Sequence, residues 1–435
     1  MSADLFPGAS GAAEPERVVM ITSSYPRFPG DTVGTFLEPI AHGVAARGHE
    51  VHVVLPWHPR LARPSREGNV HFHPFRYAPL ARLNVFGYAG ALKADVHLRV
   101  AAIAAAPLAL VAAWRTARRV ARDIRATVIH AHWVIPCGAV GAAMAGTRPL
   151  VVSLHGSDVF VAERHAVIGA AARAAFRRAG WVTACSDDLR QRAVALGAPA
   201  DRIETVPYGV DAARFRPDPA ARAQRRSQLG IRPDQPLLFT AGRLVRKKGF
   251  EYLIDAMADV AARWPDATLV IGGGGDLDTE LRARARDRSV ANRVIFTGVL
   301  NQHDVAAWLA AADVAVVPSV RDDAGNVDGL PNVVMEALAS GTPLVATTAG
   351  GIGAVARDGE TALLVAERDP AALARAIGAL LDSPPLCAGI GNAARQAVLD
   401  LHSWAHVAER FEHAYRQAGC RARHLLDAEG AQSGQ

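Results

Sequence analysis

The segment 328–336, with the sequence DGLPNVVME, combines two acids with a glycine and a proline at a fixed spacing. It follows an apolar run, 314–318, that predicts a strand, and it opens a predicted helix over 332–340. The first turn of a helix offers unbonded backbone N–H groups and a partial positive charge, which suit a phosphate. Asp328 before the helix and Glu336 within it can accept hydrogen bonds from sugar and ribose hydroxyls. The pattern alone is equally typical of an ordinary loop before a helix, so other segments must decide between the two interpretations.

Four further segments follow predicted strands in the same way. The loop 23–35 contains Gly34 just before a helix, where a glycine lets backbone N–H groups approach an anion. Segment 155–158 reads HGSD and offers two polar side chains to a substrate, or simply a helix cap. Segment 242–249 reads GRLVRKKG, and its cations suit a diphosphate or form a solvated turn. The glycine run 272–275 lacks the spacing of a dinucleotide-binding loop and predicts a tight turn.

Composition describes a globular chain. Of its 435 residues 50% are hydrophobic and 21% are charged, which predicts two or three domains with ample core. The 4 cysteines are not spaced as in metal-binding motifs, and we expect them to be reduced thiols of a cytoplasmic protein. Residues 1–16 lack the apolar run of a secretory signal. The apolar stretch 100–113 is shorter than the roughly 18–20 residues that span a bilayer, so it predicts a buried helix.

Positive charge gathers in the first half of the chain. Residues 1–220 carry 25 Lys/Arg against 17 Asp/Glu, a net charge of +8, and the rest carry 23 against 25, or −2. Part of the excess is a run of arginines whose 3–4 spacing places four of them on one helical face. These arginines are Arg115, Arg118, Arg119, Arg122 and Arg125. The face is either solvated or contacts anionic lipid headgroups or an anionic acceptor, which would place the protein peripherally at the inner face of the cell membrane. Nucleic acid is not expected as a partner, because no aromatic residues interleave with the basic ones.

Apolar runs alternate with helical patterns along the whole chain, which predicts parallel sheets in two α/β halves. In the first half the predicted strands are 18–22, 51–55, 128–131, 150–154, 181–184 and 203–206. In the second half they are 237–241, 268–271, 294–297, 314–318, 343–346 and 362–365. The segment 207–219, rich in Pro and Gly, is a natural boundary. In such folds ligands bind at the carboxyl ends of the strands.

With these motifs in order, the chain resembles the retaining glycosyltransferases of family 4. The matching segments run from Gly30 to Trp404, and the envelope and exopolysaccharide enzymes of the family look most similar. They are GDTVG at 30–34, HGSD at 155–158, VPYGVD at 206–211, GR at 242–243 with KKG at 247–249, and DGLP at 328–331 with Glu336. The resemblance implies the GT-B fold, in which two Rossmann-like domains face each other. It also implies a C-terminal helix that crosses back to the first domain.

The expected domains follow from this resemblance. Residues 1–210 form an acceptor domain onto which a helix over 403–420 packs. Residues 220–402 form the domain that binds the nucleotide sugar. The polar residues 421–435 predict a disordered tail.

The resemblance also implies roles for individual residues. Arg243 and Lys248 would hold the donor diphosphate, and Gly34 would approach it from the other domain. His155 would lie beside the anomeric carbon, with Asp158 supporting it or the acceptor. These four charged or polar side chains, His155, Asp158, Arg243 and Lys248, form the predicted catalytic set.

The remaining predicted residues bind the donor. Asp328 would contact the sugar hydroxyls, and Glu336 would bind the ribose. Backbone groups beside Asp328 would assist, and the nucleobase would lie at a later strand end. These residues are Gly329, Leu330, Asn332, Thr297, Gly298 and Val299. Family members most often carry Glu where this chain has Asp328, so the shorter side chain leaves the identity of the donor sugar open.

The predicted reaction moves a hexosyl group from a UDP- or GDP-sugar to a saccharide or lipid-linked acceptor, in polysaccharide or glycolipid synthesis. Arg243 and Lys248 would stabilise the negative charge of the leaving diphosphate, so neither a metal nor a cofactor is expected. The acidic pair Asp276 and Asp278 is therefore not taken as a metal motif. An epimerase or hydrolase of nucleotide sugars on the same fold is the alternative, and a catalytically silent sugar-binding protein is a third.

Overall fold

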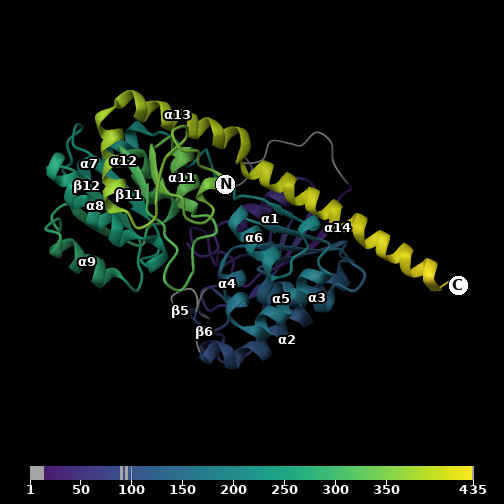
Figure 1. The fold of residues 1–435 in the computed structure, drawn as a ribbon. Helices are drawn as coiled ribbons and strands as arrows, with labels where there is room; N and C mark the ends of the chain where they lie inside the picture. The colour runs from purple at the N-terminus through teal and green to yellow at the C-terminus, as the bar shows by residue number, and fades with distance from the viewer. Residues whose placement is uncertain (1–13, 89–91, 94–96, 99, 434–435) are drawn as a thin grey trace. The chain divides into compact units, whose positions relative to one another are not determined.

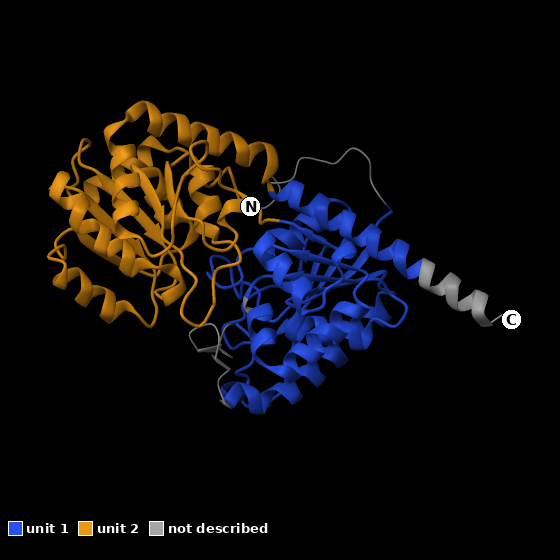
Figure 2. Ribbon diagram, in the orientation of Figure 1, with its two compact units in different colours: residues 1–206, 404–435 blue, residues 207–403 orange. Residues whose placement is uncertain are grey.

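A computed structural model describes residues 14–88, 92–93, 97–98 and 100–433 (Figure 1). The first thirteen residues, part of the segment for which no secretory signal is expected, lie outside the described residues. The chain divides into two compact units (Figure 2). Unit 1 combines the residues up to Val206 with those from Trp404 onward, and unit 2 is Pro207–Ser403, all of whose residues are described.

Unit 1 is built on an eight-stranded sheet in the described part of the chain, with the order β10-β9-β8-β7-β1-β2-β4-β3. All neighbouring pairs are parallel except β3 with β4. The strands are β1 (Arg17–Ile21), β2 (Glu50–Pro56), β3 (Arg66–Glu67), β4 (Val70–Phe75), β7 (Val128–His132), β8 (Leu150–Leu154), β9 (Trp181–Ala184) and β10 (Ile203–Thr205). Central strands such as β8 are buried along their whole length, because helices cover both faces of a parallel sheet.

The helices of unit 1 form two layers. α1 packs on α14, which also contacts β8 and β9, whereas α2 contacts β1, β2 and β4 and continues the other layer with α3 and α5. Their bounds are α1 (Leu37–Ala46), α2 (Val100–Asp123), α3 (Ala139–Met144), α4 (Ser157–Arg164), α5 (Ala166–Arg178), α6 (Asp187–Leu196) and α14 (Trp404–Ser433). A separate pair of short strands, β5 (Leu92–Lys93) and β6 (His97–Leu98), precedes α2.

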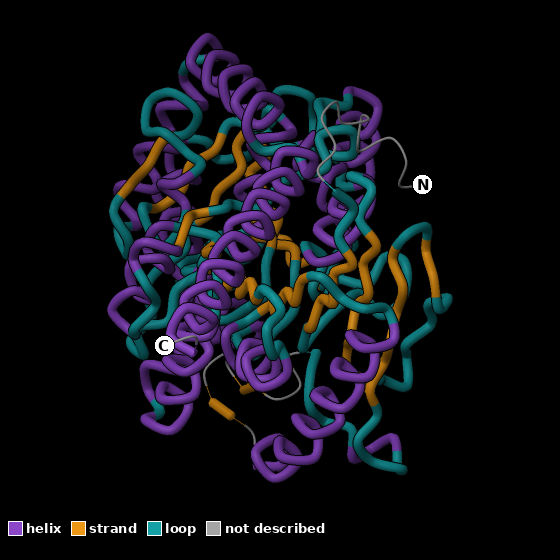
Figure 3. Tube along the Cα trace, turned by 90° about the vertical axis from the view of Figure 1, so that its right-hand side faces the viewer, coloured by secondary structure: helices purple, strands orange, loops and turns teal. Residues whose placement is uncertain are grey.

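Unit 2 contains a six-stranded, fully parallel sheet in the order β13-β12-β11-β14-β15-β16. Its strands are β11 (Leu237–Ala241), β12 (Thr268–Gly272), β13 (Val294–Gly298), β14 (Val314–Val317), β15 (Leu344–Thr347) and β16 (Leu363–Val365). Its helices are α7 (Pro219–Gln228), α8 (Phe250–Arg263), α9 (Asp278–Asp287), α10 (Gln302–Ala311), α11 (Asn332–Ser340), α12 (Pro370–Asp382) and α13 (Pro384–Leu401). Figure 3 shows strands in orange among helices in purple.

The core of unit 2 lies between its sheet and the layer of α8, α9 and α12. Along α8, Leu253, Met257 and Val260 recur every three or four residues and are fully buried, as an amphipathic helix requires. They pack against strand side chains such as Leu269 and Val316. The predicted fold class, two α/β domains with parallel sheets, is therefore confirmed.

Several predicted boundaries differ from the structure. The segment 207–219 belongs to unit 2, since Phe215 is buried and Val210 forms a β-bridge with Ser403. Strand β4 was not predicted, because its two histidines and Pro74 interrupt the apolar alternation. The disorder expected over 421–435 does not hold as far as Ser433, where α14 ends, because that segment is rich in good helix formers such as Ala, Arg and Leu.

Helix α2 contains both the apolar stretch and the arginine run of the sequence. Its buried face includes Ala109, Ala113 and Ala117. Its other side exposes Ile103, Leu108 and Val111, followed by the arginines. Within the described ranges, no helix is long and apolar enough to cross a membrane. All four cysteines are free thiols, as the sequence predicts.

Candidate functional site

The predicted site residues gather at two places where the strand order reverses. In unit 2 the reversal lies between the neighbouring strands β11 and β14. The carboxyl end of β11 leads to Arg243 and the lysines, and that of β14 leads to Asp328. In unit 1 the reversal lies between β1 and β7, whose ends lead to Gly34 and His132. Open α/β sheets bind ligands at such reversals, because the loops there diverge and leave a crevice.

Unit 2 contains a compact cluster of two lysines and one aspartate. Lys247 Nζ lies 2.9 Å from Asp328 Oδ1, and Lys248 Nζ lies 2.5 Å from Asp328 Oδ2. All three side chains are at most 15% exposed. Burial alone would raise the pKa of Asp328, but the two ammonium groups hold it well below its usual range. The carboxylate is thus ionised, and the cluster carries one net positive charge.

Two glycines let the backbone close around this cluster. Gly249, which follows the 3₁₀ turn Arg246–Lys248, has φ of +64°, and a Cβ there would lie 1.9 Å from the Pro318 carbonyl oxygen. Gly350, with φ of +59°, would bring a Cβ to 2.1 Å from the carbonyl oxygen of Asp328. Only glycine tolerates both the left-handed conformation and the close approach. The two positions therefore fix the backbone that carries the lysines and the aspartate.

Glu336 lies on the first turns of α11, behind the cluster. Burial raises its pKa to about 7, although the positive charges of Lys248 and Arg214 oppose the shift. The helix begins after Pro331, which forms no side-chain cap, so the first N–H groups of α11 are not bonded by a capping side chain. The segment thus presents N–H donors at its start and a titratable carboxyl group further along.

The other predicted donor residues of unit 2 lie at the carboxyl ends of its strands or in the loops that follow them. Arg243 is exposed and is the second residue after β11. Thr297 and Gly298 end β13, and the next residue, Val299, is 71% exposed, so it offers an apolar surface to a ligand. Leu330 is buried and supports the loop from inside the unit. Gly329 precedes it, and Asn332 begins α11.

His155 of unit 1 lies in an aromatic and histidine-rich environment after β8. Its Nε2 is 3.0 Å from Nδ1 of His132, and its ring packs against Phe36 and Trp133 at centroid distances of 4.7 and 4.9 Å. Burial, reinforced by the nearby His130, lowers the pKa of His155 to about 3. The imidazole is therefore neutral at physiological pH.

Asp158 holds the loops around His155 through backbone contacts. Its Oδ2 accepts a 2.7 Å hydrogen bond from the N–H of Val134, and its Oδ1 accepts one of 3.1 Å from the N–H of Gly156. Burial raises the pKa of this carboxyl to about 6, although those backbone N–H groups lower it. Both carboxylate oxygens thus accept hydrogen bonds from the backbone. This favours a role in which Asp158 holds the loop over one in which it takes part in the reaction.

A buried polar chain connects this region to the C-terminal helix. His130 contacts Tyr415 Oη of α14 at 2.9 Å through Nδ1, and Ser153 Oγ at 2.7 Å through Nε2. Ser153 Oγ in turn lies 2.7 Å from Thr183 Oγ1. The neighbouring His132 is fully buried, and its Nε2 has no hydrogen-bond partner among the described residues. Gly34 lies in the loop before α1, where its carbonyl accepts from the N–H of Leu37.

Sequence reasoning thus missed several residues that line these places. The motif KKG predicts no separate role for Lys247, although it pairs with Asp328 as Lys248 does. His132 ends β7 and Trp133 follows it, so both could have been found from the same strand-end rule. Gly350 and Phe36 gave no signal in the chain, because their proximity to Asp328 and His155 depends on the tertiary fold.

Known protein families match both units. Residues 33–214 match the model described as Glycosyltransferase Family 4, and residues 221–397 match Glycosyl transferases group 1. The chain is 38% identical over 265 residues to the GDP-mannose-dependent alpha-(1-6)-phosphatidylinositol monomannoside mannosyltransferase of Mycolicibacterium smegmatis, which covers 60% of this chain and 68% of the relative. It is 30% identical over 421 residues to the glycogen synthase of Mycobacterium tuberculosis, covering 92% of this chain and 95% of the relative.

Solved structures show the same architecture. Sucrose-phosphate synthase from Thermosynechococcus elongatus aligns with a TM-score of 0.73 at 21% identity, covering 92% of this chain and 98% of that one. HepE from Anabaena in complex with UDP aligns with a TM-score of 0.69 at 21% identity, covering 91% and 98%. These likenesses confirm the predicted GT-B fold. Together with the sequence matches they show that the chain belongs to the family 4 glycosyltransferases.

Proposed function

We propose that this glycosyltransferase moves a hexosyl group, with retention of configuration, from a UDP- or GDP-sugar to a saccharide or lipid-linked acceptor. The observation that carries the proposal is the cluster of Lys247, Lys248 and Asp328 where the strand order of unit 2 reverses. Relatives support the donor class, since one is named for GDP-mannose and a fold neighbour was solved with UDP. They also support the acceptor class, because a phosphatidylinositol mannoside and glycogen appear in their names.

Breaking the bond between the anomeric carbon and the diphosphate leaves negative charge on the leaving group. Arg243, Lys247 and Lys248 supply positive charge after β11, and the uncapped start of α11, which follows the adjacent strand β14, adds N–H donors. A diphosphate would compete with Asp328 for the lysines. Donor binding would then release the Asp328 carboxylate toward the sugar hydroxyls, which are neutral partners it can accept from.

The ribose and the base of the donor would contact residues beyond those that bind the diphosphate. Glu336 would accept hydrogen bonds from the ribose, and the exposed Val299 beside Thr297 and Gly298 would lie under the base. Backbone groups of Gly329, Leu330 and Asn332 would bind the sugar together with Asp328.

In unit 1 the arrangement supports His155 as a neutral hydrogen-bonding group beside the reacting carbon. Its lowered pKa excludes a positively charged ring, which would repel the positive charge that develops on the sugar. Asp158 would hold the His155 loop through Val134 and Gly156 rather than attack the sugar. The acceptor hydroxyl would then attack on the face that the diphosphate leaves, and its proton would pass to the leaving phosphate.

We also propose that α2 brings the enzyme to an anionic membrane at the inner face of the cell. Leu108, Val111, Arg115, Arg118 and Arg122 follow one another at helical spacing and form a stripe. The apolar half of the stripe is 45–62% exposed at Leu108 and Val111, and all the arginines are exposed. A stripe that is apolar at one end and basic at the other suits a helix that inserts one end and pairs the other with headgroups.

The transferase proposal is tested with labelled nucleotide sugars, each incubated with and without candidate acceptors. We expect product only when acceptor is present, with the anomeric configuration of the donor retained in the product by NMR. Conversion of the donor to an isomer without acceptor would instead show an epimerase, and release of free sugar at the full rate would show a hydrolase.

Membrane binding is tested by sedimentation with vesicles of phosphatidylcholine, with or without phosphatidylglycerol. We expect binding only to the anionic vesicles, and about tenfold less binding for the double variant Arg118→Glu, Arg122→Glu. The double variant Arg225→Glu, Arg286→Glu in unit 2 removes the same charge elsewhere and controls for net charge. Equal loss in both variants would contradict docking through α2.

A further inference from the structure

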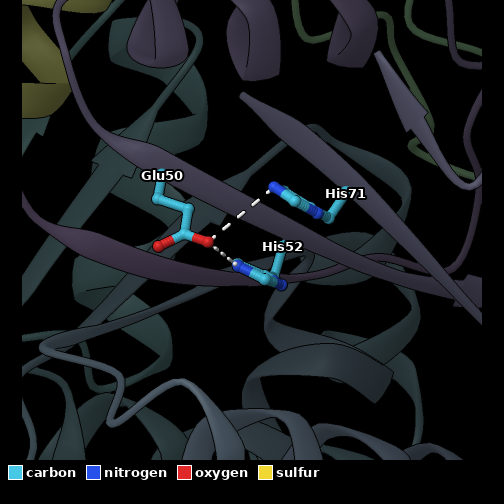
Figure 4. A group of neighbouring side chains, drawn as sticks. All are labelled: Glu50, His52 and His71. Carbon is cyan, nitrogen blue, oxygen red and sulfur yellow. Dashed lines mark hydrogen bonds and ion pairs between the residues drawn. The ribbon is translucent and has the colours of Figure 1, made fainter. Parts of the chain in front are cut away.

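Three side chains of unit 1, from strands β2 and β4, converge on one face of the sheet (Figure 4). Glu50 and His52 lie two residues apart on β2 and so point to the same face. The register of β2 with β4 places His71 directly beside His52. Glu50 Oε1 lies 3.0 Å from His52 Nε2 and 3.7 Å from His71 Nε2, so both imidazoles present a nitrogen to one carboxylate oxygen.

This group lies away from the candidate active site. Glu50 and His52 begin β2, and His71 is the second residue of β4, so all three occupy the amino ends of parallel strands. His132 is the carboxyl-terminal residue of β7, and Gly34 and His155 follow the carboxyl ends of β1 and β8 in the same sheet. The two groups therefore lie at opposite ends of the strands. The Glu50 group has no part in the proposed transfer reaction.

We propose that Glu50, His52 and His71 bind a zinc ion. Two imidazole nitrogens and a carboxylate oxygen are ligands that Zn²⁺ takes in proteins, with bonds of about 2.0–2.2 Å. In a tetrahedron such bonds separate the ligand atoms by about 3.4 Å. The observed separations from Glu50 Oε1, 3.0 and 3.7 Å, lie on either side of that value. All the ligand atoms of the group lie within 4.8 Å of one another.

A fourth side chain orients one of the ligands. His52 Nδ1 lies 2.9 Å from His73 Nε2, the next residue along the same face of β4. If zinc binds His52 through Nε2, the ring proton lies on Nδ1 and can be donated to His73 Nε2. Zinc-binding histidines commonly use their second nitrogen in this way.

The ligands differ in how freely they can move. The side chain of His52 is 6% exposed, that of His71 is 23% exposed and that of Glu50 is 42% exposed. An ion can therefore enter from the solvent side and keep water as its fourth ligand. The rings of His52 and His71 stack at 4.5 Å with planes 7° apart. A shared ion requires these planes to converge, so the partly exposed His71 must turn about its χ2 bond on binding.

The structure also contains a second group of similar residues that serves as a control. Glu38, His42 and Glu67 lie within ligand distance of one another. Arg63, however, contacts both carboxylates, with Nη1 at 2.7 and 2.9 Å from the Glu67 oxygens and Nη2 on Glu38. Its guanidinium already supplies the positive charge there. Among the described residues, Glu50 has no lysine or arginine within ion-pair distance, so the two groups predict opposite behaviour.

Zinc at this position would tie β2 to β4 and so stabilise unit 1. An ion that binds only the folded state adds stability in proportion to the logarithm of its concentration relative to Kd. The expected signature is thus a melting temperature that rises with zinc, independent of any donor or acceptor. Magnesium should have no such effect, because it prefers oxygen ligands.

The test uses the full-length protein without a histidine tag, stripped with chelator and dialysed. We expect calorimetry and metal analysis to give one zinc per chain, and the melting temperature to rise by several degrees. His71→Ala and Glu50→Gln, both at partly exposed positions, should each weaken zinc binding at least tenfold. Circular dichroism of the zinc-free variants checks that both remain folded.

Two control variants locate the ion. His42→Ala changes the group that Arg63 occupies, and His303→Ala removes an exposed histidine of unit 2; both should bind zinc as the wild type does. Zinc bound equally well by folded His71→Ala and Glu50→Gln would overturn the proposal. So would loss of zinc in His42→Ala, or a wild-type protein that binds less than one zinc at micromolar concentration.

Discussion

The two candidate regions handle charge in opposite ways. In unit 2, Lys247, Lys248 and Asp328 are buried as ions, and their mutual attraction keeps the carboxyl ionised against the cost of burial. In unit 1, burial governs instead: the pKa of His155 falls to about 3 and that of Asp158 rises to about 6. Charge is thus concentrated where a diphosphate would bind, and it is suppressed where the reacting carbon and a hydroxyl would meet.

The difference matches the demands of glycosyl transfer. A leaving diphosphate needs fixed cations, which cost little to use because they are already desolvated and held in place. The carbon side needs a dry environment without a positive charge, and under the proposed function the neutral His155 among Phe36 and Trp133 would provide it. Substitutions of the cations in unit 2 should therefore change turnover with little effect on folding. Substitutions of the buried polar residues around His155 in unit 1 should also reduce stability.

The largest effect is expected from the cations of unit 2. Lys248→Ala and Arg243→Ala should each lower kcat about 10²-fold or more, since each removes charge that stabilises the leaving group in the transition state. Arg246→Ala is the matched control, because Arg246 lies on the same turn but pairs with Glu280. Initial rates at saturating donor measure the effect. A rate near that of the wild type in either variant would remove these residues from the leaving-group site.

In unit 1 the expected effect of Asp158→Ala is on stability. The change leaves the buried N–H groups of Val134 and Gly156 without their acceptor, at a cost of about 1 kcal/mol or more each. Urea unfolding should show a loss of about 2 kcal/mol, whereas Asp201→Ala at an exposed position should change stability by less than about 0.5 kcal/mol. If Asp158→Ala lost only activity and kept its full stability, Asp158 would have a chemical role instead.

A smaller, pH-dependent effect is expected at Glu336. Its pKa, raised by burial to about 7, means that the carboxyl keeps its proton until the pH rises through that value. The ionised form, which accepts from both ribose hydroxyls, is therefore lost as the pH falls below about 7. The KM for the donor should rise about tenfold between pH 8 and pH 6, in proportion to the ionised fraction.

Glu336→Gln provides the control for this pH effect. The amide cannot titrate, so the KM of the variant should be higher at pH 8 and should not change toward pH 6. If wild type and variant show the same pH profile, another group titrates and Glu336 does not bind the ribose.

Sequence reasoning placed the candidate residues at strand ends better than it predicted the contacts among them. The strand-end rule found the loops of Arg243, Asp328 and His155, because apolar runs of five residues mark buried parallel strands clearly. It could not show that consecutive residues Lys247 and Lys248 reach the same carboxylate. In a strand they would point to opposite faces, and only the 3₁₀ turn over Arg246–Lys248 lets both contact Asp328.

Contacts that depend on pairing between distant segments were beyond the sequence. The zinc group needs β4 to lie beside β2 in one register, and β4 itself was not predicted because His71, His73 and Pro74 break its apolar pattern. His132 lies beside His155 only because β7 and β8 are neighbours. Local spacing reports which face of an element a residue occupies, but not which element lies next to it.

The smallest expected effect, none at all, concerns removal of divalent metal. If Arg243, Lys247 and Lys248 balance the charge of the diphosphate, kcat at 25 °C should not change in excess EDTA. The proposed zinc ion would lie at the amino ends of the strands of unit 1, whereas His155 follows the carboxyl end of β8. Loss of the ion should therefore lower the melting temperature and leave the rate unchanged. Parallel measurements of rate and melting temperature in EDTA, with zinc or magnesium restored, separate the two roles. If turnover were lost in EDTA and restored by magnesium or manganese, a metal rather than the lysines would stabilise the leaving group. The contrast between the charged cluster of unit 2 and the desolvated site of unit 1 would then no longer explain catalysis.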